Sequence, residues 1–247
     1  MEAMNAEALL RVWEETGGAH MVRRALALLD AAWPELGLQN WARAPIGERD
    51  GCLLQLREAL FGKQLQTVSC CPRCGERIES EFTTQDIRTQ PPALPAPRTP
   101  LRLQEQGHDI SYRLPNSEDL LLACDDAGVA DGVAATLLRR CVIEARCGGL
   151  PLDAAALPAG VVQKLAGEME QRDPGAEIRM ALTCPACNQA WSASFDIVSY
   201  LWGEIEDWAQ RLLADVHTLA GSYNWSERDI LALSPARRQF YLDMVRA

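Results

Sequence analysis

Two short cysteine motifs contain the residues whose types and spacing point most directly to chemistry. The first runs from Cys71 to Cys74 and encloses Pro-Arg, and the second runs from Cys184 to Cys187 and encloses Pro-Ala. Such a turn places two thiolates on one side of the backbone, and four thiolates together form a tetrahedral ligand set that suits zinc. The spacing therefore predicts one structural zinc site with these four cysteines as ligands.

The other cysteines leave alternatives open. Cys70 could replace Cys71 as a ligand, but Cys71 is favoured because its frame matches that of the second motif. The odd total of nine cysteines, in a chain without the pattern of a secretion signal, argues against a disulfide framework. Two unrelated pairs of buried thiols are the alternative to a joint metal site. Four further cysteines are expected to be small core residues, namely Cys52, Cys124, Cys141 and Cys147.

A site filled by four cysteines has no open coordination position, so a structural role is expected rather than catalysis. The chain lacks the nucleotide-binding motifs G-x-x-x-x-G-K-[ST] and G-x-G-x-x-G and the hydrolase motifs G-x-S-x-G and H-E-x-x-H. Its three histidines, His20, His108 and His217, are scattered singly. We therefore expect neither enzyme activity nor a small-molecule substrate. A zinc hydrolase with an open ligand position is the catalytic alternative.

The elements that must position the cysteines are two similar strand pairs. A strand-like run precedes each motif, at residues 65–69 and 178–183, and Phe82 and Phe195 each follow the first cysteine of their motif by eleven positions. Each unit is predicted to be a β-hairpin with the metal turn at its tip. Because the second motif begins 110 positions after Cys74, the zinc would join distant segments as a split four-cysteine ribbon.

Apolar residues at three- to four-residue spacing predict helices over most of the remaining chain. Shorter helices are expected at residues 6–13, 19–29, 47–61, 117–123, 134–145, 161–170, 227–233 and 236–245. Residues 101–106 and 110–114 predict another hairpin that turns at Gly107-His108. The expected fold class is α+β and mostly helical.

Six segments describe the expected organisation of the chain. They are N-terminal helices (1–62), a first zinc hairpin (63–90), a proline-rich linker (91–100), a hairpin with a helical middle region (101–177), a second zinc hairpin (178–196) and C-terminal helices (197–247). Five prolines in ten residues exclude helix and central strand from the linker.

The longest expected helix spans residues 198–219 and is amphipathic. Trp202 and Trp208 lie on its apolar side, where tryptophans are more often core than contact residues. A helix of this length could nevertheless dock on a partner. The candidate partner-binding residues are Trp202, Trp208, Trp225, Arg237 and Arg238.

Composition argues against several classes of function. The 247 residues include 34 acidic and 24 basic side chains, which gives a formal net charge of −10. Such a chain lacks the positive field that nucleic-acid binding uses. No stretch approaches the roughly 18 apolar residues of a membrane span, and the N-terminus has no signal-peptide pattern. We expect a cytoplasmic protein that does not bind membranes.

The order of motifs resembles the baseplate hub assembly chaperone family of contractile-tailed phages and phage-tail-like extracellular injection systems. The resemblance covers most of the chain from about residue 45 onward. It is carried by residues 47–62, the two cysteine motifs, Tyr-Arg-Leu-Pro-Asn-Ser-Glu-Asp-Leu at 112–120, Phe-Asp-Ile-Val-Ser-Tyr-Leu-Trp at 195–202, and residues 217–225 and 229–238.

The resemblance implies a non-enzymatic assembly factor or minor structural component that contacts baseplate hub or spike proteins. It implies a location in the bacterial cytoplasm, and it also allows incorporation into an injection particle. A zinc-ribbon regulator that binds nucleic acid is the alternative. That alternative is weakened because Arg73 and Arg77 are balanced by Glu76, Glu79 and Glu81 around the first motif.

Overall fold

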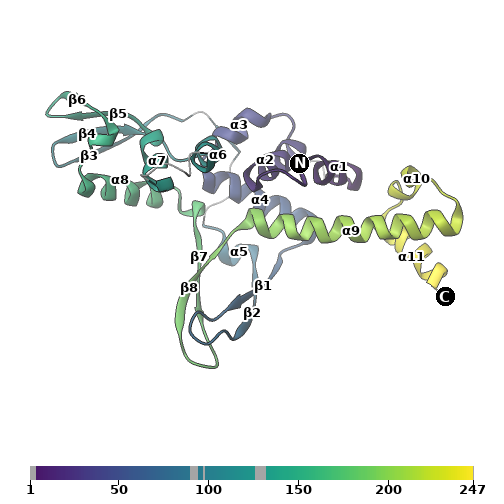
Figure 1. Cartoon of the computed structure of the whole chain (residues 1–247). Helices are drawn as coiled ribbons and strands as arrows, with labels where there is room; N and C mark the ends of the chain where they lie inside the picture. Colours follow the sequence, from purple (N-terminus) through teal and green to yellow (C-terminus); the bar gives the residue numbers. More distant parts are fainter. Residues whose placement is uncertain (1–3, 90–93, 97, 126–131, 247) are drawn as a thin grey trace.

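The computed structural model of the chain describes residues 4–89, 94–96, 98–125 and 132–246, and of these it leaves out the side chains of 124, 125 and 132–135. Part of the predicted linker and the predicted core position of Cys124 therefore lie outside the described residues. Helices and small antiparallel sheets alternate along the chain, so the expected mixture of helix and sheet is confirmed (Figure 1). None of the described helices is long and apolar enough to cross a bilayer.

The N-terminal part consists of helices. They are α1 (Ala6–Thr16), α2 (Met21–Ala32), α3 (Leu38–Arg43) and α4 (Ile46–Phe61). Sequence periodicity missed α3, since six residues do not make two helical turns. The imidazole Nδ1 of His20 caps α2 by accepting a hydrogen bond of 3.3 Å from the Val22 N–H.

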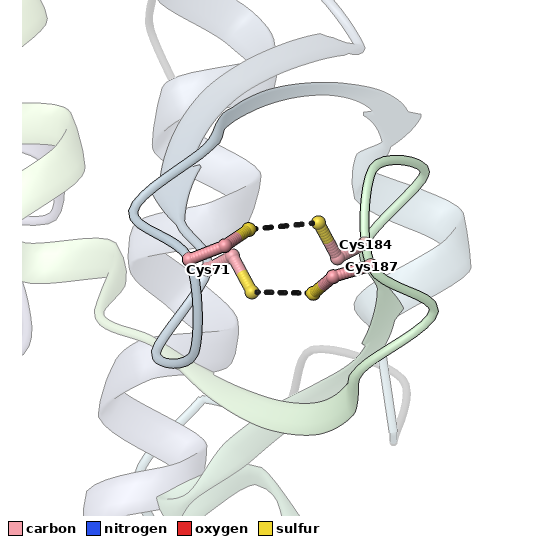
Figure 2. A group of neighbouring side chains, drawn as sticks. Cys71, Cys184 and Cys187 are labelled. Atoms are coloured by element: carbon pink, nitrogen blue, oxygen red, sulfur yellow. Dashed lines mark hydrogen bonds between the residues drawn. The ribbon is translucent and has the colours of Figure 1, made fainter.

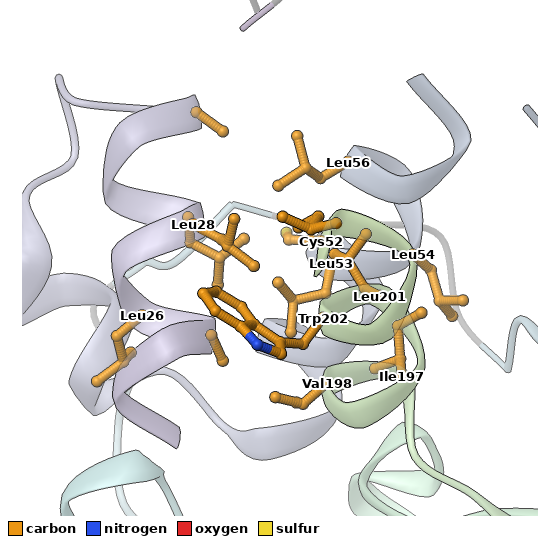
Figure 3. Packing of buried hydrophobic residues seen from close by; sticks show 14 of the residues in the cluster. Leu26, Leu28, Cys52, Leu53, Leu54, Leu56, Ile197, Val198, Leu201 and Trp202 are labelled. Carbon is orange, nitrogen blue, oxygen red and sulfur yellow. The ribbon is translucent and has the colours of Figure 1, made fainter. Parts of the chain in front are cut away.

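The main core lies where α2 and α4 pack against the first half of the long helix α9 (Ile197–Tyr223) (Figure 3). Leu28, Leu53 and Leu201 are at most 1% exposed, and the Trp202 ring packs among them. Full burial of each such side chain contributes about 1.5–3 kcal/mol. This core holds together segments from both ends of the chain.

Two antiparallel strand pairs extend from this core. The pairs are β1 (Gln64–Cys70) with β2 (Arg77–Thr83), and β7 (Ile178–Thr183) with β8 (Ala190–Phe195). Leu65 faces Phe82 in the first register, and Ile178 faces Phe195 at the equivalent position of the second. The two phenylalanine rings meet edge to face, with centroids 5.7 Å apart. Both pairs therefore start from one shared apolar contact and lead toward the cysteine turns (Figure 1).

The middle of the chain forms a four-stranded antiparallel sheet with a separate core. Its order is β3 (Leu101–Glu105), β4 (His108–Tyr112), β5 (Val142–Cys147) and β6 (Leu150–Leu152). The helix α8 (Ala159–Arg172) places Val161 and Leu165 against Ile110 and Tyr112 of the sheet. The connecting helical elements are α5 (Thr84–Ile87), α6 (Ser117–Asp125), α7 (Gly132–Cys141) and the one-turn 3-10 segments η1 (Ala154–Ala156) and η2 (Pro174–Ala176).

The prediction of one helix over residues 134–145 is wrong for its last part, because residues 142–147 form a strand. The helix α7 ends at Cys141, and the chain continues directly as β5. Val142 and Ile143 are β-branched and favour a strand, and pairing with β4 buries Ala145 in the sheet core. A strand partner distant in sequence thus overrides the local helical pattern.

Two smaller predictions in this region are also wrong. Cys147 is exposed at the end of β5, whereas Cys52 and Cys141 are buried as predicted. The turn between β3 and β4 falls one residue earlier than expected, at Gln106-Gly107, since Glu105 pairs with His108. Gln106 and Gly107 have positive φ angles of 48° and 76°. Positive φ at both central positions is typical of the two-residue turn that suits a twisted hairpin.

The C-terminal part is carried by α9, whose 27 residues span about 40 Å. Its far end packs against α10 (Glu227–Leu231) and α11 (Pro235–Arg246) around a small apolar cluster. The buried members of that cluster are Val216, Leu219, Ile230 and Leu242. Figure 1 shows this group, here called the C-terminal arm, at the opposite end of the molecule from the four-stranded sheet.

Candidate metal centre

The structure brings the four predicted ligands together. The sulfur atoms of Cys71, Cys74, Cys184 and Cys187 all lie within 4.8 Å of one another. Two contacts link the turns directly, with Sγ–Sγ distances of 3.7 Å from Cys71 to Cys187 and 3.6 Å from Cys74 to Cys184 (Figure 2). This arrangement can offer four sulfur ligands to one metal ion.

The two turns share one backbone conformation. Gly75 and Asn188 each follow the second cysteine of their motif and have positive φ angles of 76° and 55°. Their N–H groups donate hydrogen bonds of 2.9 Å to the carbonyl oxygens of Cys71 and Cys184. Glycine and asparagine are the residues that adopt this left-handed conformation most easily. The local sequence therefore builds each turn.

The environment of the sulfur atoms favours negative charge on one of them before a metal is considered. Desolvation raises the pKa of Cys71. Hydrogen bonds from the N–H groups of Cys74 and Arg73, together with contacts to the thiols of Cys74 and Cys187, outweigh this effect and lower the pKa to about 7. At Cys187 the Gln189 N–H lowers the pKa, but desolvation and the three other cysteines outweigh it and raise the pKa to about 12. Four thiols this close need a cation to be ionised together.

The adjacent Cys70 lies outside this cluster. Its side chain is exposed, and its backbone pairs with Arg77 across the first strand pair. Successive side chains of a strand point to opposite faces, so the step from Cys70 to Cys71 decides which sulfur turns toward the second motif. The choice of Cys71 over Cys70, which rests on the spacing that the two motifs share, agrees with the cluster found in the structure.

The five candidate partner-binding residues occupy different environments. Trp202 is 3% exposed in the main core, with the Arg24 guanidinium 4.5 Å from its ring centroid, and Trp208 is half-buried against the same core. Trp225 stacks on another aromatic ring in the C-terminal arm. Arg238 is buried, and Arg237 is the one of the five in an exposed position. Partner binding by these residues stays a prediction.

Sequence analysis missed a buried ion-pair network near the middle sheet. The Asp119 carboxylate is completely buried and accepts two hydrogen bonds from Arg113, at 2.5 and 2.8 Å, and one of 3.1 Å from Arg140. Burial alone would raise the pKa of Asp119, but these guanidinium groups and the Asn116 N–H lower it below its ordinary value. No local pattern in the sequence indicates this network, because Arg113 and Arg140 lie 27 positions apart and meet at Asp119 only in the folded chain.

Comparison of the chain with protein-family models, with curated proteins and with solved structures found no match. The function proposed below therefore rests on the cysteine cluster, on the shape of the molecule and on the motif resemblance.

Proposed function

We propose that the four cysteines hold one structural zinc ion. A tetrahedral site with zinc–sulfur bonds of about 2.3 Å has sulfur–sulfur edges of about 3.8 Å, and the contacts between the turns are 3.6 and 3.7 Å. A site filled by four thiolates leaves no position for a substrate. Its role is to join two strand pairs whose motifs lie 110 or more positions apart.

Metal analysis of the purified chain tests this assignment. One zinc per chain, and a cobalt-substituted spectrum typical of four thiolates in a tetrahedron, are expected. A spectrum with fewer sulfur ligands, or iron in place of zinc, would contradict it.

We propose further that the chain is a non-enzymatic assembly factor or minor component for the baseplate hub or spike of a phage-tail-like contractile injection system. The observation that carries this proposal is the C-terminal arm. The most specific motifs of the resemblance, at 195–202, 217–225 and 229–238, lie in α9, α10 and α11 or at their ends. The motif at 195–202 lies in the main core, whereas those at 217–225 and 229–238 belong to the C-terminal arm, at the opposite end of the molecule from the four-stranded sheet (Figure 1).

The surface of the arm is suited to contact with another protein. Phe240 and Met244 stand one helical turn apart on α11 and are 63% and 47% exposed, and Arg237 precedes them on the same helix. Exposed aromatic, methionine and arginine side chains are those that protein interfaces favour. A hub protein bound there would contact the C-terminal arm, and the main core with its two zinc-linked strand pairs would support the arm.

An affinity pull-down from the native cell, with every co-eluting protein quantified, tests the assembly role. Hub or spike proteins are expected in near-stoichiometric amounts with the wild-type chain, and in much lower amounts with Phe240→Ala or Arg237→Glu. Arg211→Glu makes the same charge change on an exposed position of α9 and serves as the matched control. Recovery of nucleic acid or transcription machinery without tail proteins would favour the nucleic-acid regulator instead.

A further inference from the structure

An open groove of ≈ 680 Å³ runs between the two strand pairs. Its strand residues come from β2 and β7, and the short segment after β2 and the end of α8 complete the lining. Among the residues that the structure describes, these two strands belong to separate two-stranded sheets, so each has one edge without a strand partner there. The groove therefore lies along two free strand edges. It is distinct from the metal centre and from the C-terminal arm.

The register shows which backbone groups face the free edge of β7. The Cys184 N–H donates to the Gln189 carbonyl, at 2.9 Å, and this pair continues the register of β7 and β8. In an antiparallel ladder bonded pairs alternate with pairs whose N–H and C=O groups turn outward. The backbone groups of Arg179 and Ala181 therefore point away from β8, on the side that the groove occupies.

The same alternation identifies the outward-facing backbone groups of β2. The Cys71 N–H donates to the Glu76 carbonyl, so the backbone groups of Glu79 and Glu81 turn away from β1. The bond of 3.1 Å from the Gln66 N–H to the Tyr200 hydroxyl agrees with this alternation, because Gln66 faces Glu81 and also turns outward. Of these two residues Glu81 lines the groove, so its outward backbone groups border the same groove as those of Arg179 and Ala181.

The side chains of the groove combine an apolar row with an acidic rim. Ile178, Met180 and Leu182 form the row on one face of β7, and Phe82 adds to the apolar lining. The charged lining residues are Glu81, Asp86, Glu170, Glu177 and Arg179. The single cation pairs with Glu177 at 2.8 Å, so the rim keeps an excess of negative charge. An occupant should therefore carry positive charge and alternate apolar side chains.

We propose that this groove binds an extended basic segment of a partner protein by strand addition to the free edge of β7. The backbone of the segment bonds to the outward groups of Arg179 and Ala181, as an added strand does in β-augmentation. Its apolar side chains pack beside Met180, and its lysines or arginines meet the acidic rim. This inference stands on the groove alone and does not depend on the proposed assembly role.

Synthetic peptides test the proposal on the full zinc-loaded chain. The probe is a fluorescent ten-residue peptide in which lysine and valine alternate, and its binding is followed by anisotropy at low ionic strength. One control peptide has glutamate in place of lysine, and another has the same composition with all lysines before all valines. We expect the alternating basic peptide to bind at least about tenfold more tightly than either control, with an affinity that falls as salt rises.

Two proline variants separate edge pairing from general attraction. Ala181→Pro removes an outward N–H at the groove, whereas Ser192→Pro changes the residue directly opposite, whose outward N–H lies on the other edge of the same strand pair. Both positions are exposed, and neither N–H belongs to the bonded pairs between β7 and β8. The affinity should fall about tenfold in the first variant and stay unchanged in the second.

A charge pair provides a second test that does not touch the strands. Glu170→Lys changes the acidic rim, and Glu206→Lys makes the same change on an exposed part of α9. Only the first should weaken the basic peptide. The proposal would be overturned if the alternating basic peptide did not bind. It would also be overturned if Ala181→Pro and Ser192→Pro changed its affinity equally and the two charge variants did so as well. Retained zinc content and an unchanged circular dichroism spectrum establish that each variant is folded.

Discussion

At the scale of single residues, side chains of similar chemistry differ in burial and therefore in their expected roles. Cys70 is exposed, while the adjacent Cys71 is buried with its sulfur 3.7 Å from that of Cys187. Among the acidic residues, the carboxylate of Asp119 is buried, whereas that of Glu144 is exposed. Each contrast provides a matched pair of variants.

Cys71→Ser should lose most of the bound zinc and lower the thermal midpoint, whereas Cys70→Ser should retain both. A structural zinc site supplies on the order of 10 kcal/mol of binding energy, part of which orders the two strand pairs. Zinc content by mass spectrometry and a thermal melt measure the two effects. Equal zinc content in the two variants would show that Cys71 is not a ligand.

Asp119→Asn should destabilise the fold by about 3 kcal/mol at neutral pH, because it leaves two arginines facing an uncharged group. The pKa of Asp119 is lowered in the folded protein, so its contribution is present above the unfolded pKa of about 4 and is lost as pH falls through the folded pKa. The difference between variant and wild type should therefore shrink in acid.

Urea unfolding at a series of pH values measures this difference. Glu144→Gln removes an exposed ion pair with Arg146 and should change the free energy of unfolding by no more than about 0.5 kcal/mol. A loss of stability for Asp119→Asn that stays constant down to strong acid would contradict the assignment.

At the scale of elements, the start of α4 is held against the η2 turn by a contact between segments more than 120 positions apart. The Gly47 N–H donates to the Asp173 carboxylate at 3.0 Å, so a distant side chain caps the first turn of α4. Burial raises the pKa of Asp173, although the bond from Gly47 lowers it. The contact fixes where the chain returns to the main core before β7 begins.

Gly47→Ala should destabilise the protein by about 1–3 kcal/mol. A Cβ at this position would overlap Asp173 Oδ1 and lie 2.8 Å from the Ala176 backbone nitrogen, so the turn must move. Gly51→Ala, on the same helix, meets nothing within 4 Å and should stabilise by about 0.5–1 kcal/mol. Chemical unfolding of the two variants gives the comparison, and a shift of the same sign in both would refute the close contact.

At the scale of the whole molecule, the described residues form three apolar clusters that the chain joins at different points. The main core unites the N-terminal helices with the first half of α9, the middle sheet packs on α8, and the C-terminal arm has a cluster of its own. The four-cysteine cluster lies at the turns that end the two strand pairs, beyond the main core (Figure 1). Its influence should therefore be local.

Removal of zinc by a chelator should speed amide hydrogen exchange in β1, β2, β7 and β8 while α2 and α4 remain protected. The main core holds the strand pairs at their base, and in our proposal the zinc joins their tips, so the tips should separate when the zinc is removed. Exchange followed by mass spectrometry resolves these segments. Uniform loss of protection over all helices would mean that the zinc supports the entire fold.

Local sequence patterns were enough to predict the four-cysteine cluster, the presence of the long C-terminal helix and the mixture of helix and sheet. These follow from local patterns: three-residue cysteine spacing, a left-handed residue after each second cysteine, and apolar side chains at helical intervals. Three features became evident only in the folded chain: residues 142–147 form a strand, Asp173 caps α4, and β2 and β7 border a groove. Each of these depends on a partner distant in sequence, whose position is set when the clusters pack.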